Sequence, residues 1–545
     1  MPITKENVIV ADHPVDHSEV LPTAPDKPLV ESYFEALRTR VATKGDRAFL
    51  INGADVTQKI MLSELEPMAR QYAKVYTSLG LKRNDKMQIS IPNSLEYFPL
   101  ALGAWVCGAI PSVTDPDLAE STVIAQIQDT RALIVICSPT NAERFHKALA
   151  KVEGVESKLI VLDDPAAPNE YPNKAGIPLL SDLLKSDKLQ DPKPITDFRT
   201  DQVSYISWSS GTTGVPKGIQ MSFDFIKHRF VYGKATIPGW DLLTTCMFHI
   251  SGFGELVIGG MRHEVVFFRD SDLVKDIKLI LKACDQFNIT KMIMGTHHVA
   301  QLAAIKDAVP SGLNVNRVRV IIPVGTSFHP HMSDEVKTIF PNVIFVNCYS
   351  MTEVAFLVSM SLSLTCLGPV MEGHEVKIVD PNTREALKPH QVGEIMIKPP
   401  YPFPGYLNKP EETAKFCEPD GFCHSGDFGH YDEDGLLYFD GRMKEIIKFK
   451  NNHIHPFELE TLIQQLPGVE EVGVYGEPDP ASQELATAVV RLTPGCQMSE
   501  NEIIEAVAAK VDDFKQLRGG VRFVEKELPR NAMGKLLRRN LNSCK

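Results

Sequence analysis

The sequence lacks several patterns that mark metal-binding or secreted proteins. No two of its ten cysteines are spaced as C-x-x-C, and the group nearest to a metal cluster is Cys417, Cys423 and His424. Structural zinc sites use two close-spaced ligand pairs, so zinc is not expected there. No secretory signal segment is seen, which together with the scattered cysteines predicts a reducing intracellular compartment.

A basic excess and a clear membrane span are also missing. The formal net charge is -12, whereas binding to a nucleic-acid backbone needs a basic stripe, so no nucleic-acid partner is expected. Two uncharged stretches, 97–114 and 354–371, are borderline in length for a membrane helix, and their Pro, Gly and Ser content predicts buried core segments instead. Peripheral membrane contact stays open. Residues 542–545 do not form the S-K-L import signal, so a cytoplasmic location is expected rather than a peroxisomal one.

The length and the hydrophobic pattern predict more than one domain. The chain has 545 residues, 43% of them apolar, which exceeds a single hydrophobic core. Residues 29–190 and 222–350 each alternate helical spacing with short apolar strands, which is typical of α/β subdomains with parallel sheets. After residue 365, short strands and turns indicate a small β-barrel, and the last stretch of about 100 residues has the size of a small α+β domain.

Individual elements follow from the same pattern. We predict strands at 86–91, 133–137, 159–162, 265–268, 292–294, 318–323, 343–346, 376–379, 393–398 and 436–439, and helices at 65–79, 456–465 and 500–511. Ser63 and Glu66 have the spacing of a capping box at the start of the first of these helices.

The run from 207 to 218 reads SWSSGTTGVPKG, with five hydroxyl side chains, three glycines and one lysine in twelve residues. Glycines let the backbone approach a ligand, while hydroxyls, backbone N–H groups and a lysine suit phosphate oxygens. Residues 203–206 predict a strand, so the loop is expected at a strand's carboxyl end, where ligands bind in open α/β sheets. The composition alone fits a flexible polar turn equally well. The kinase-type phosphate loop is excluded, because Val215 and Pro216 separate Gly214 from Lys217.

Five further motifs carry groups suited to chemistry, and each has a plain structural interpretation when taken alone. Residues 347–353, NCYSMTE, follow an apolar strand, and HSGD at 424–427 is a common turn. The segment 439–448, FDGRMKEIIK, could be a solvated charged edge, and LPRNAMGK at 528–535 a basic tail. His249, in FHISGF, could be a buried core histidine.

Together with the loop, these motifs resemble, in order, the six signature elements of the adenylate-forming enzymes: acyl-CoA synthetases, aryl-CoA ligases, beetle luciferases and peptide-synthetase adenylation domains. The resemblance covers nearly the whole chain. It implies an α/β fold with a large N-terminal domain at 1–441, made of two α/β subdomains plus a small β-barrel. It further implies a hinge at 442–444 and a small mobile α+β C-terminal domain at 445–545.

The resemblance implies ATP and Mg²⁺ as cofactors and assigns their contacts. Tyr349 would stack on adenine, Thr352 would contact the α-phosphate, and Glu353 would hold Mg²⁺. Asp427 would bind the ribose hydroxyls, and Arg442 would lie at the ribose and phosphate edge. The ATP phosphates would be held by the loop residues Ser209, Ser210, Gly211, Thr212, Thr213, Gly214 and Lys217.

The resemblance also implies a two-step reaction. A small carboxylic acid, fatty or aryl, would be joined to AMP with Lys535 as the catalytic cation and His249 beside the carboxylate. Rotation about Lys444 would then present Lys448 for transfer to coenzyme A, the co-substrate. His249, Gly325 and Thr326 would border the acyl pocket. We expect a monomer or a weak dimer.

The chain departs from the family pattern at several positions. Ser350 and Gly441 replace a usual glycine and aspartate, with Asp440 one residue early, and Asn451 replaces a glycine that borders the pantetheine tunnel. The acyl-pocket segments read VGTS at 324–327 and MGTHH at 294–298, which is consistent with a polar or aromatic acid or with simple repacking. Alternative functions are a luciferase-like or carrier-protein-loading enzyme and a catalytically silent nucleotide-binding relative.

Overall fold

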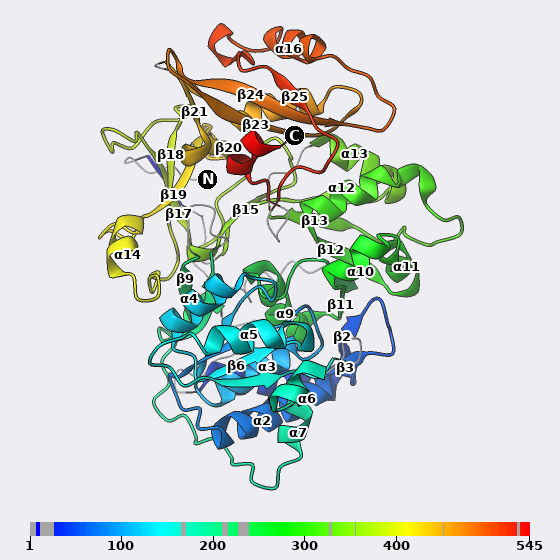
Figure 1. Cartoon of the computed structure of the whole chain (residues 1–545), viewed down its shortest axis with the longest axis vertical. Helices are drawn as coiled ribbons and strands as arrows, with labels where there is room; N and C mark the ends of the chain where they lie inside the picture. Colours follow the sequence, from blue (N-terminus) through cyan, green and yellow to red (C-terminus); the bar gives the residue numbers. More distant parts are fainter. Residues whose placement is uncertain are drawn as a thin grey trace.

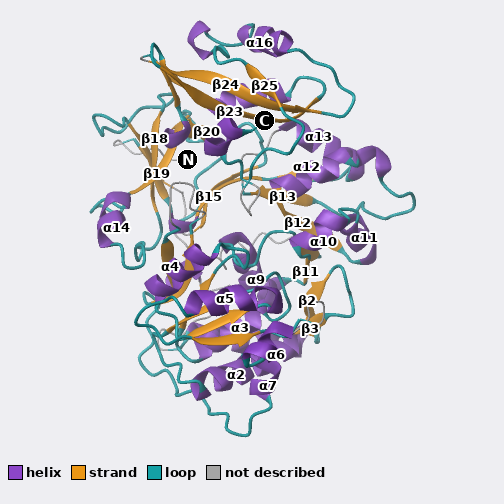
Figure 2. Cartoon of the chain, viewed as in Figure 1, coloured by secondary structure: helices purple, strands orange, loops and turns teal. Residues whose placement is uncertain are grey.

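A computed structural model describes residues 7–10, 27–164, 170–209, 216–226, 239–325, 330–354, 356–450, 452–530 and 535–544. Two α/β parts form the lower body of the molecule, a mainly antiparallel sheet lies beside them, and the last residues of the chain form a smaller domain above (Figure 1). Helices surround the strands of the lower body (Figure 2). The predicted α/β class, with a large N-terminal and a small C-terminal domain, is confirmed.

The first sheet has the order β7-β6-β4-β5-β8-β9, with all neighbours parallel except the β8–β9 hairpin. In β6, Ile134 and Ile136 belong to one core, whereas Val135 and Cys137 belong to another, so the two faces are covered separately. The strands are β4 Lys86–Ser90, β5 Ile110–Val113, β6 Ile134–Cys137, β7 Lys158–Val161, β8 Val203–Trp208 and β9 Gly218–Ser222, and the helices are α2 Leu62–Ser78, α3 Tyr97–Val106, α4 Glu120–Thr130, α5 Ala142–Leu149, α6 Glu170–Ala175 and α7 Leu180–Leu184.

The second sheet has the order β14-β13-β12-β10-β11-β2-β3 and is parallel up to β2. Its strands are β2 Ala48–Asn52, β3 Lys59–Met61, β10 Trp240–Leu243, β11 Val265–Phe267, β12 Ile289–Gly295, β13 Val320–Val324 and β14 Ile344–Phe345. Its helices are α1 Leu29–Lys44, α9 Ile250–Arg262, α10 Asp270–Lys275, α11 Leu279–Gln286, α12 Thr296–Ala304 and α13 Pro330–Ile339.

The two predicted α/β segments, 29–190 and 222–350, are therefore not two separate sheets. Residues 48–61 cross to the second sheet, where β2 pairs with β11, and β8 and β9 complete the first. The division by sequence was wrong because hydrophobic periodicity predicts an element but not its hydrogen-bonding partner.

The third sheet is antiparallel, in the order β1-β17-β18-β19-β20, and it corresponds to the region predicted as a small barrel. Single bridges, Ser359↔Val370 and Gly368↔Leu437, connect the β15–β16 hairpin to it. The elements are β1 Val8–Val10, β15 Asn347–Met351, β16 Phe356–Ser361, β17 Glu375–Val379, β18 Gly393–Lys398, α14 Pro410–Phe416, β19 Cys423–Tyr431 and β20 Leu437–Arg442.

The C-terminal domain has a sheet and a hydrophobic core of its own. Strands β23 and β24 form a long antiparallel hairpin, with β21 and β25 beside β24. The elements are β21 Ile447–Phe449, β22 Asn452–Ile454, α15 Pro456–Gln464, β23 Val469–Asp479, β24 Gln483–Leu492, α16 Glu500–Ala508 and β25 Val521–Phe523.

Two local predictions need correction. Helix α2 begins at Leu62, and its first turn is capped by Glu64, which accepts the N–H of Met61 at 2.7 Å. Ser63 instead donates to Asp46 at 2.6 Å, so the predicted capping box is wrong.

The stretch 97–114 is buried as predicted, but in 354–371 the side chain of Leu362 is 72% exposed beyond strand β16.

The group of Cys417, Cys423 and His424, considered above as a metal site, does not contain two free thiols. Cys417 and Cys423 form a disulfide, so neither sulfur is available as a metal ligand. His424 lies instead 3.1 Å from Glu394. In the part of the chain that the structure describes, no helix combines the length and apolarity needed to cross a membrane.

A buried ion-pair network holds helix α9 against the second sheet. His263 lies 2.7 Å from Asp241 and 2.8 Å from Glu255, and the Nζ of Lys291 lies 2.5 Å from Asp241 and 3.3 Å from Glu255. Burial opposes the charge of His263, but the two carboxylates outweigh burial and raise its pKa to about 9. Two cations thus balance two anions, as burial requires. The network fixes the helix that begins directly after His249.

Removing the lysine from this network should be strongly destabilising, because two buried carboxylates would then share one imidazolium. We expect Lys291→Met to lower the free energy of unfolding by about 3–5 kcal/mol. Lys282→Met is the matched control, since Lys282 pairs with Asp276 on the surface and should cost less than about 1 kcal/mol. Urea unfolding followed by circular dichroism measures both, and equal losses would contradict the role of the buried network.

Candidate active site

A cavity of about 1230 Å³ lies where the large body meets the C-terminal domain. Segments far apart in the chain line it: the β8–β9 hairpin, the turn after β15, the ends of β19 and β20, and the chain end. The predicted site residues among its lining are Ser209, Lys217, His249, Gly325, Thr352, Glu353, Asp427, Arg442, Lys444 and Lys535. The structure therefore brings together most of the residues selected from the sequence.

The predicted phosphate loop begins where strand β8 ends at Trp208, which confirms its position at a strand's carboxyl end. Ser209 and Lys217 close the loop: the N–H of Lys217 donates to Ser209 Oγ at 2.9 Å, and the N–H of Ser209 donates to the Lys217 carbonyl at 3.0 Å. The intervening Ser210, Gly211, Thr212, Thr213 and Gly214 lie outside the described residues, as does Thr326.

Lys217 belongs to a chain of polar contacts that ends at Glu353. Its ammonium pairs with Glu412 and lies 4.9 Å from the ring centre of Tyr406. The Tyr406 hydroxyl donates to Glu353 Oε1 at 3.0 Å. Burial raises the pKa of Glu353, so a cation placed beside it would relieve the cost of its negative charge.

Asp427 is the most buried carboxylate of the site, with 6% of its surface exposed. Its Oδ2 accepts the hydroxyl of Tyr349 at 2.8 Å, and its backbone N–H donates to Ser425 Oγ. Its Oδ1 lies 3.4 Å from Arg442 Nε but makes no hydrogen bond within the described part of the chain. Burial raises the pKa of Asp427. Oδ1 is therefore a buried acceptor that a ligand hydroxyl could satisfy.

Tyr349 lies beside Asp427. It is 8% exposed, and it is not among the described residues that line the cavity. Its hydroxyl orients Asp427, which is a positioning contact that the motif did not predict. Stacking of its ring on adenine stays a prediction.

His249 and Gly325 approach the cavity from the second sheet. The His249 carbonyl accepts the N–H of Phe253 in the first turn of α9, and its Nδ1 lies 2.8 Å from Ser251 Oγ. Burial lowers the pKa of His249 to about 4, so this imidazole is neutral near pH 7. Gly325 follows β13 with φ of 104°, a conformation that side chains rarely adopt.

Lys535 reaches the cavity from the chain end. Burial is the main cause that lowers its pKa, to about 8, with repulsion from Arg442 second; Glu445 and Asp427 act against both. Because burial and Arg442 both disfavour the charge of this ammonium, an anion bound in the cleft would stabilise it.

The segment after Lys535 is anchored by Arg538. Its Nε donates to Glu460 Oε1 at 3.0 Å and its Nη2 to Oε2 at 2.6 Å, while Nη1 pairs with Glu445. Glu460 is 3% exposed and also accepts the N–H of Val474. This bidentate geometry holds the chain end against α15 and β23.

The predicted hinge at 442–444 overlaps a one-turn 3₁₀ helix, Met443–Glu445, in which Lys444 is exposed to the cavity. Just before it, Gly441 has φ of 143°, and a Cβ there would lie 2.7 Å from His455 Nδ1. The usual aspartate therefore has no room at this position. Asp440 instead pairs with His430 at 2.7 Å.

Lys448 lies apart from this group. It is exposed on strand β21, where its backbone N–H donates to Glu484 at 2.7 Å. It does not belong to the described lining of the cavity, whereas Lys535 does.

Sequence reasoning missed three residues that organise the cleft: Tyr406, Glu412 and Glu460. Their partners are distant in the chain, so no local pattern marks them. Arg538 lies three residues after Lys535, just beyond the motif at 528–535 that was selected from the sequence.

The fold and the cleft define a class: a two-domain α/β protein whose cleft combines the buried carboxylate of Asp427 with the cations of Arg442 and Lys535. Comparison with known families names it. The model of the AMP-binding enzyme family matches residues 37–407, and that of its C-terminal domain matches 458–535. The chain belongs to the AMP-binding enzyme family.

Curated relatives span nearly its whole length. A 4-coumarate–CoA ligase of Petroselinum crispum is 29% identical over 523 residues, covering 92% of each chain. A luciferin 4-monooxygenase of Photuris pensylvanica is 28% identical over 529 residues, covering 94% of each.

Solved structures show the same fold at lower identity. An anthranilate CoA ligase in complex with anthranoyl-AMP superposes with a TM-score of 0.83 at 18% identity, covering 97% of this chain and 98% of that one. ATP-bound MatB from Rhodopseudomonas palustris superposes at 0.80 with 23% identity, covering 94% and 98%.

The lowered pKa of Lys535 predicts a pH-dependent affinity for AMP. The ammonium is present below its pKa of about 8 and is lost above it, so affinity should be constant between pH 7 and 7.5 and then fall by up to about tenfold per pH unit. Isothermal titration calorimetry measures this. Lys535→Arg keeps its charge throughout this range and should remove the dependence. A Lys535→Arg profile identical to that of the parent would show that another group titrates.

Proposed function

We propose that this protein joins a small carboxylic acid to coenzyme A at the expense of ATP, giving acyl-CoA, AMP and pyrophosphate. The observation that carries the proposal is the juxtaposition of the open Oδ1 of Asp427 with Arg442 and Lys535 in one cleft. A buried carboxylate acceptor suits a ribose diol, and the two cations suit the α-phosphate beside it.

In the first step, the carboxylate of the acid attacks the α-phosphorus of ATP, and pyrophosphate leaves. Asp427 orients the ribose, and Lys217 and Ser209 border the phosphates. Lys535 stabilises the charge that develops on the α-phosphate oxygens in the transition state. His249, neutral near pH 7, can donate a hydrogen bond to the acid without adding charge.

Glu353 would hold Mg²⁺, since Mg²⁺ prefers oxygen ligands and phosphates and the Glu353 carboxylate is held by Tyr406, while Thr352 would contact the α-phosphate. The ion would neutralise phosphate charge.

In the second step, the C-terminal domain turns about residues 442–444, Lys535 leaves the cleft, and the face carrying Lys448 replaces it. The thiolate sulfur of coenzyme A then attacks the acyl carbonyl and AMP leaves with the bonding electrons. The exposure of Lys448 outside the cleft and the one-turn helix at Lys444 support this motion. One cleft would thus serve two reactions through a domain movement.

We propose an aryl acid in preference to a long fatty acid. The support is the likeness to 4-coumarate–CoA ligases at 28–29% identity along almost the whole chain. Phe248 and Trp208 in the lining of the cleft could contact an aromatic ring. The likeness to luciferin 4-monooxygenases makes an adenylating oxygenase the second candidate.

Release of AMP from a panel of hydroxycinnamic, benzoic and fatty acids, with and without coenzyme A, tests the function. We expect AMP release that depends on coenzyme A and is fastest with a hydroxycinnamic acid. Equal turnover without coenzyme A would favour the oxygenase. Release of AMP only with a phosphopantetheine carrier would indicate a carrier-protein-loading enzyme. No AMP from any acid would identify a catalytically silent relative.

The role of Lys535 has its own test. Lys535→Ala should slow acid-dependent exchange of pyrophosphate into ATP by about 10²–10³-fold, because a transition-state cation is lost. Transfer to coenzyme A from preformed acyl-AMP should remain within a few-fold, whereas Lys448→Ala should show the reverse pattern. Lys526→Ala is the control, since Lys526 is exposed in the same domain. Unchanged exchange in Lys535→Ala would refute the assignment.

A further inference from the structure

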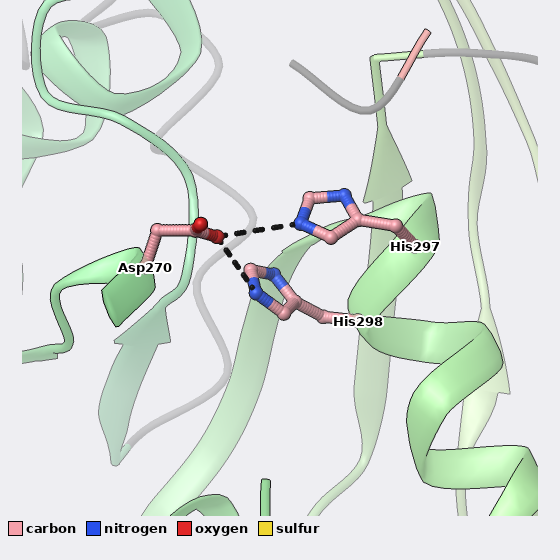
Figure 3. Close-up of side chains that lie close together, drawn as sticks. All are labelled: Asp270, His297 and His298. Carbon is pink, nitrogen blue, oxygen red and sulfur yellow. Dashed lines mark ion pairs between the residues drawn. The ribbon is translucent and has the colours of Figure 1, made fainter. Parts of the chain in front are cut away.

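Three side chains meet outside the cleft, at the carboxyl ends of β11 and β12, the two strands that flank β10 in the second sheet. Asp270 is the first residue of α10, just after β11, and His297 and His298 lie in the first turn of α12, after β12. Both imidazoles point toward the carboxylate of Asp270 (Figure 3). Asp270 Oδ1 is 3.5 Å from Nε2 of His297 and 3.2 Å from Nε2 of His298.

The contact with His298 is not a hydrogen bond, although this ring is almost fully enclosed. The side chain of His298 is 1% exposed, and its Nε2 has no hydrogen-bond partner in the described part of the chain. A hydrogen bond needs the oxygen close to the axis of the N–H group. Two ligands of one metal ion lie off each other's axis instead, because each points at the ion between them.

The other nitrogen of His298 is held in place. Its Nδ1 lies 3.1 Å from Thr244 Oγ1, which also accepts the N–H of Gly295 at 3.3 Å. A proton on Nδ1, donated to this hydroxyl, leaves the lone pair of Nε2 directed at the site. Outer-shell hydrogen bonds of this kind orient the histidine ligands of metals.

We propose that Asp270, His297 and His298 form a binding site for a divalent transition-metal ion of the Zn²⁺ class. Two zinc ligands at about 2.0–2.2 Å in tetrahedral geometry lie about 3.3–3.5 Å apart, and the separations of 3.5 and 3.2 Å are close to this range. Asp270 is 58% exposed and His297 27%, so an ion can enter and a water molecule can complete its coordination. Two imidazole nitrogens exclude Mg²⁺ and Ca²⁺ as preferred occupants.

The buried group Asp241, Glu255 and His263 contains the same residue types but differs in one respect. The ammonium of Lys291 lies among its carboxylates, 2.5 Å from Asp241, and neutralises them. No lysine or arginine pairs with Asp270 within the described residues, and its ion-pair partners there are the two histidines. Lys291 already supplies a cation to the first group, and the second is open to one.

The proposed metal site is separate from the cleft, and a bound ion would link segments at the carboxyl-end edge of the second sheet. None of the three residues is among the described lining of the cavity. A bound ion would join the β11–α10 turn to the start of α12 and, through Thr244, to the end of β10. That end leads to His249, so the ion would rigidify the support of the cleft.

Binding of Zn²⁺ to the full-length protein, without nucleotide, tests this inference. Equilibrium dialysis with zinc analysis should give one ion per chain at this site, and Zn²⁺ should raise Tm while Mg²⁺ at the same concentration does not. Asp270→Asn, at an exposed position, should weaken binding at least about tenfold and abolish the rise in Tm. His298→Ala should do the same but removes a buried ring, so Asp270→Asn is the decisive variant.

His390→Ala is the matched control, because exposed His390 lies 2.7 Å from Glu433 as a single histidine–carboxylate pair. It should bind Zn²⁺ like the parent. Replacing Zn²⁺ by Co²⁺ separates this site from cysteine sites, since thiolate ligands add charge-transfer absorption. Zinc affinity that is equal in parent and Asp270→Asn, or a Co²⁺ spectrum dominated by thiolate bands, would overturn the inference.

Discussion

The arrangement of the cleft depends on one charged contact near the chain end. Arg538 donates hydrogen bonds to both carboxylate oxygens of Glu460 and also pairs with Glu445. Glu460 in turn accepts the N–H of Val474 in strand β23. Leu536 and Leu541 also pack into a small hydrophobic cluster with Tyr475 and Val489, and the fork of Arg538 adds a directional, bidentate contact to this packing. Lys535, three residues earlier, is thereby kept at the cleft.

Burial then sets the chemistry of the groups around Lys535. It raises the pKa of Asp427 and Glu353, lowers that of Lys535, and keeps His249 neutral. Each of these shifts is a cost of removing charge from water, and an anionic nucleotide with its cation would relieve several at once. The charges of the free cleft therefore favour binding of a ligand that carries negative phosphates together with a cation. Membership of the AMP-binding enzyme family and the geometry of Asp427 point to the same ligand.

The second sheet carries two polar clusters at opposite ends of its strands. At the amino ends of β10 and β12, Lys291 closes a balanced network that fixes helix α9. At the carboxyl ends, Asp270 faces two histidines with no such cation among the described residues. The presence of one ammonium thus distinguishes a structural network from a candidate metal site. Both clusters support the segment from which His249 reaches the cleft, although neither lines it.

The sequence by itself determined the fold class, a number of the strands and helices, and the order of the motifs, because periodicity and loop chemistry are local. Strand β18 lies at the predicted residues, and the loop after Trp208 lies at a strand's end as expected. Only the tertiary structure decided that residues 48–61 join the second sheet, that Tyr349 supports Asp427 and that Asp270 meets His297 and His298. These contacts join residues that lie between 27 and 215 positions apart along the chain. Their formation depends on which strands pair and how sheets pack, and no local pattern encodes that choice.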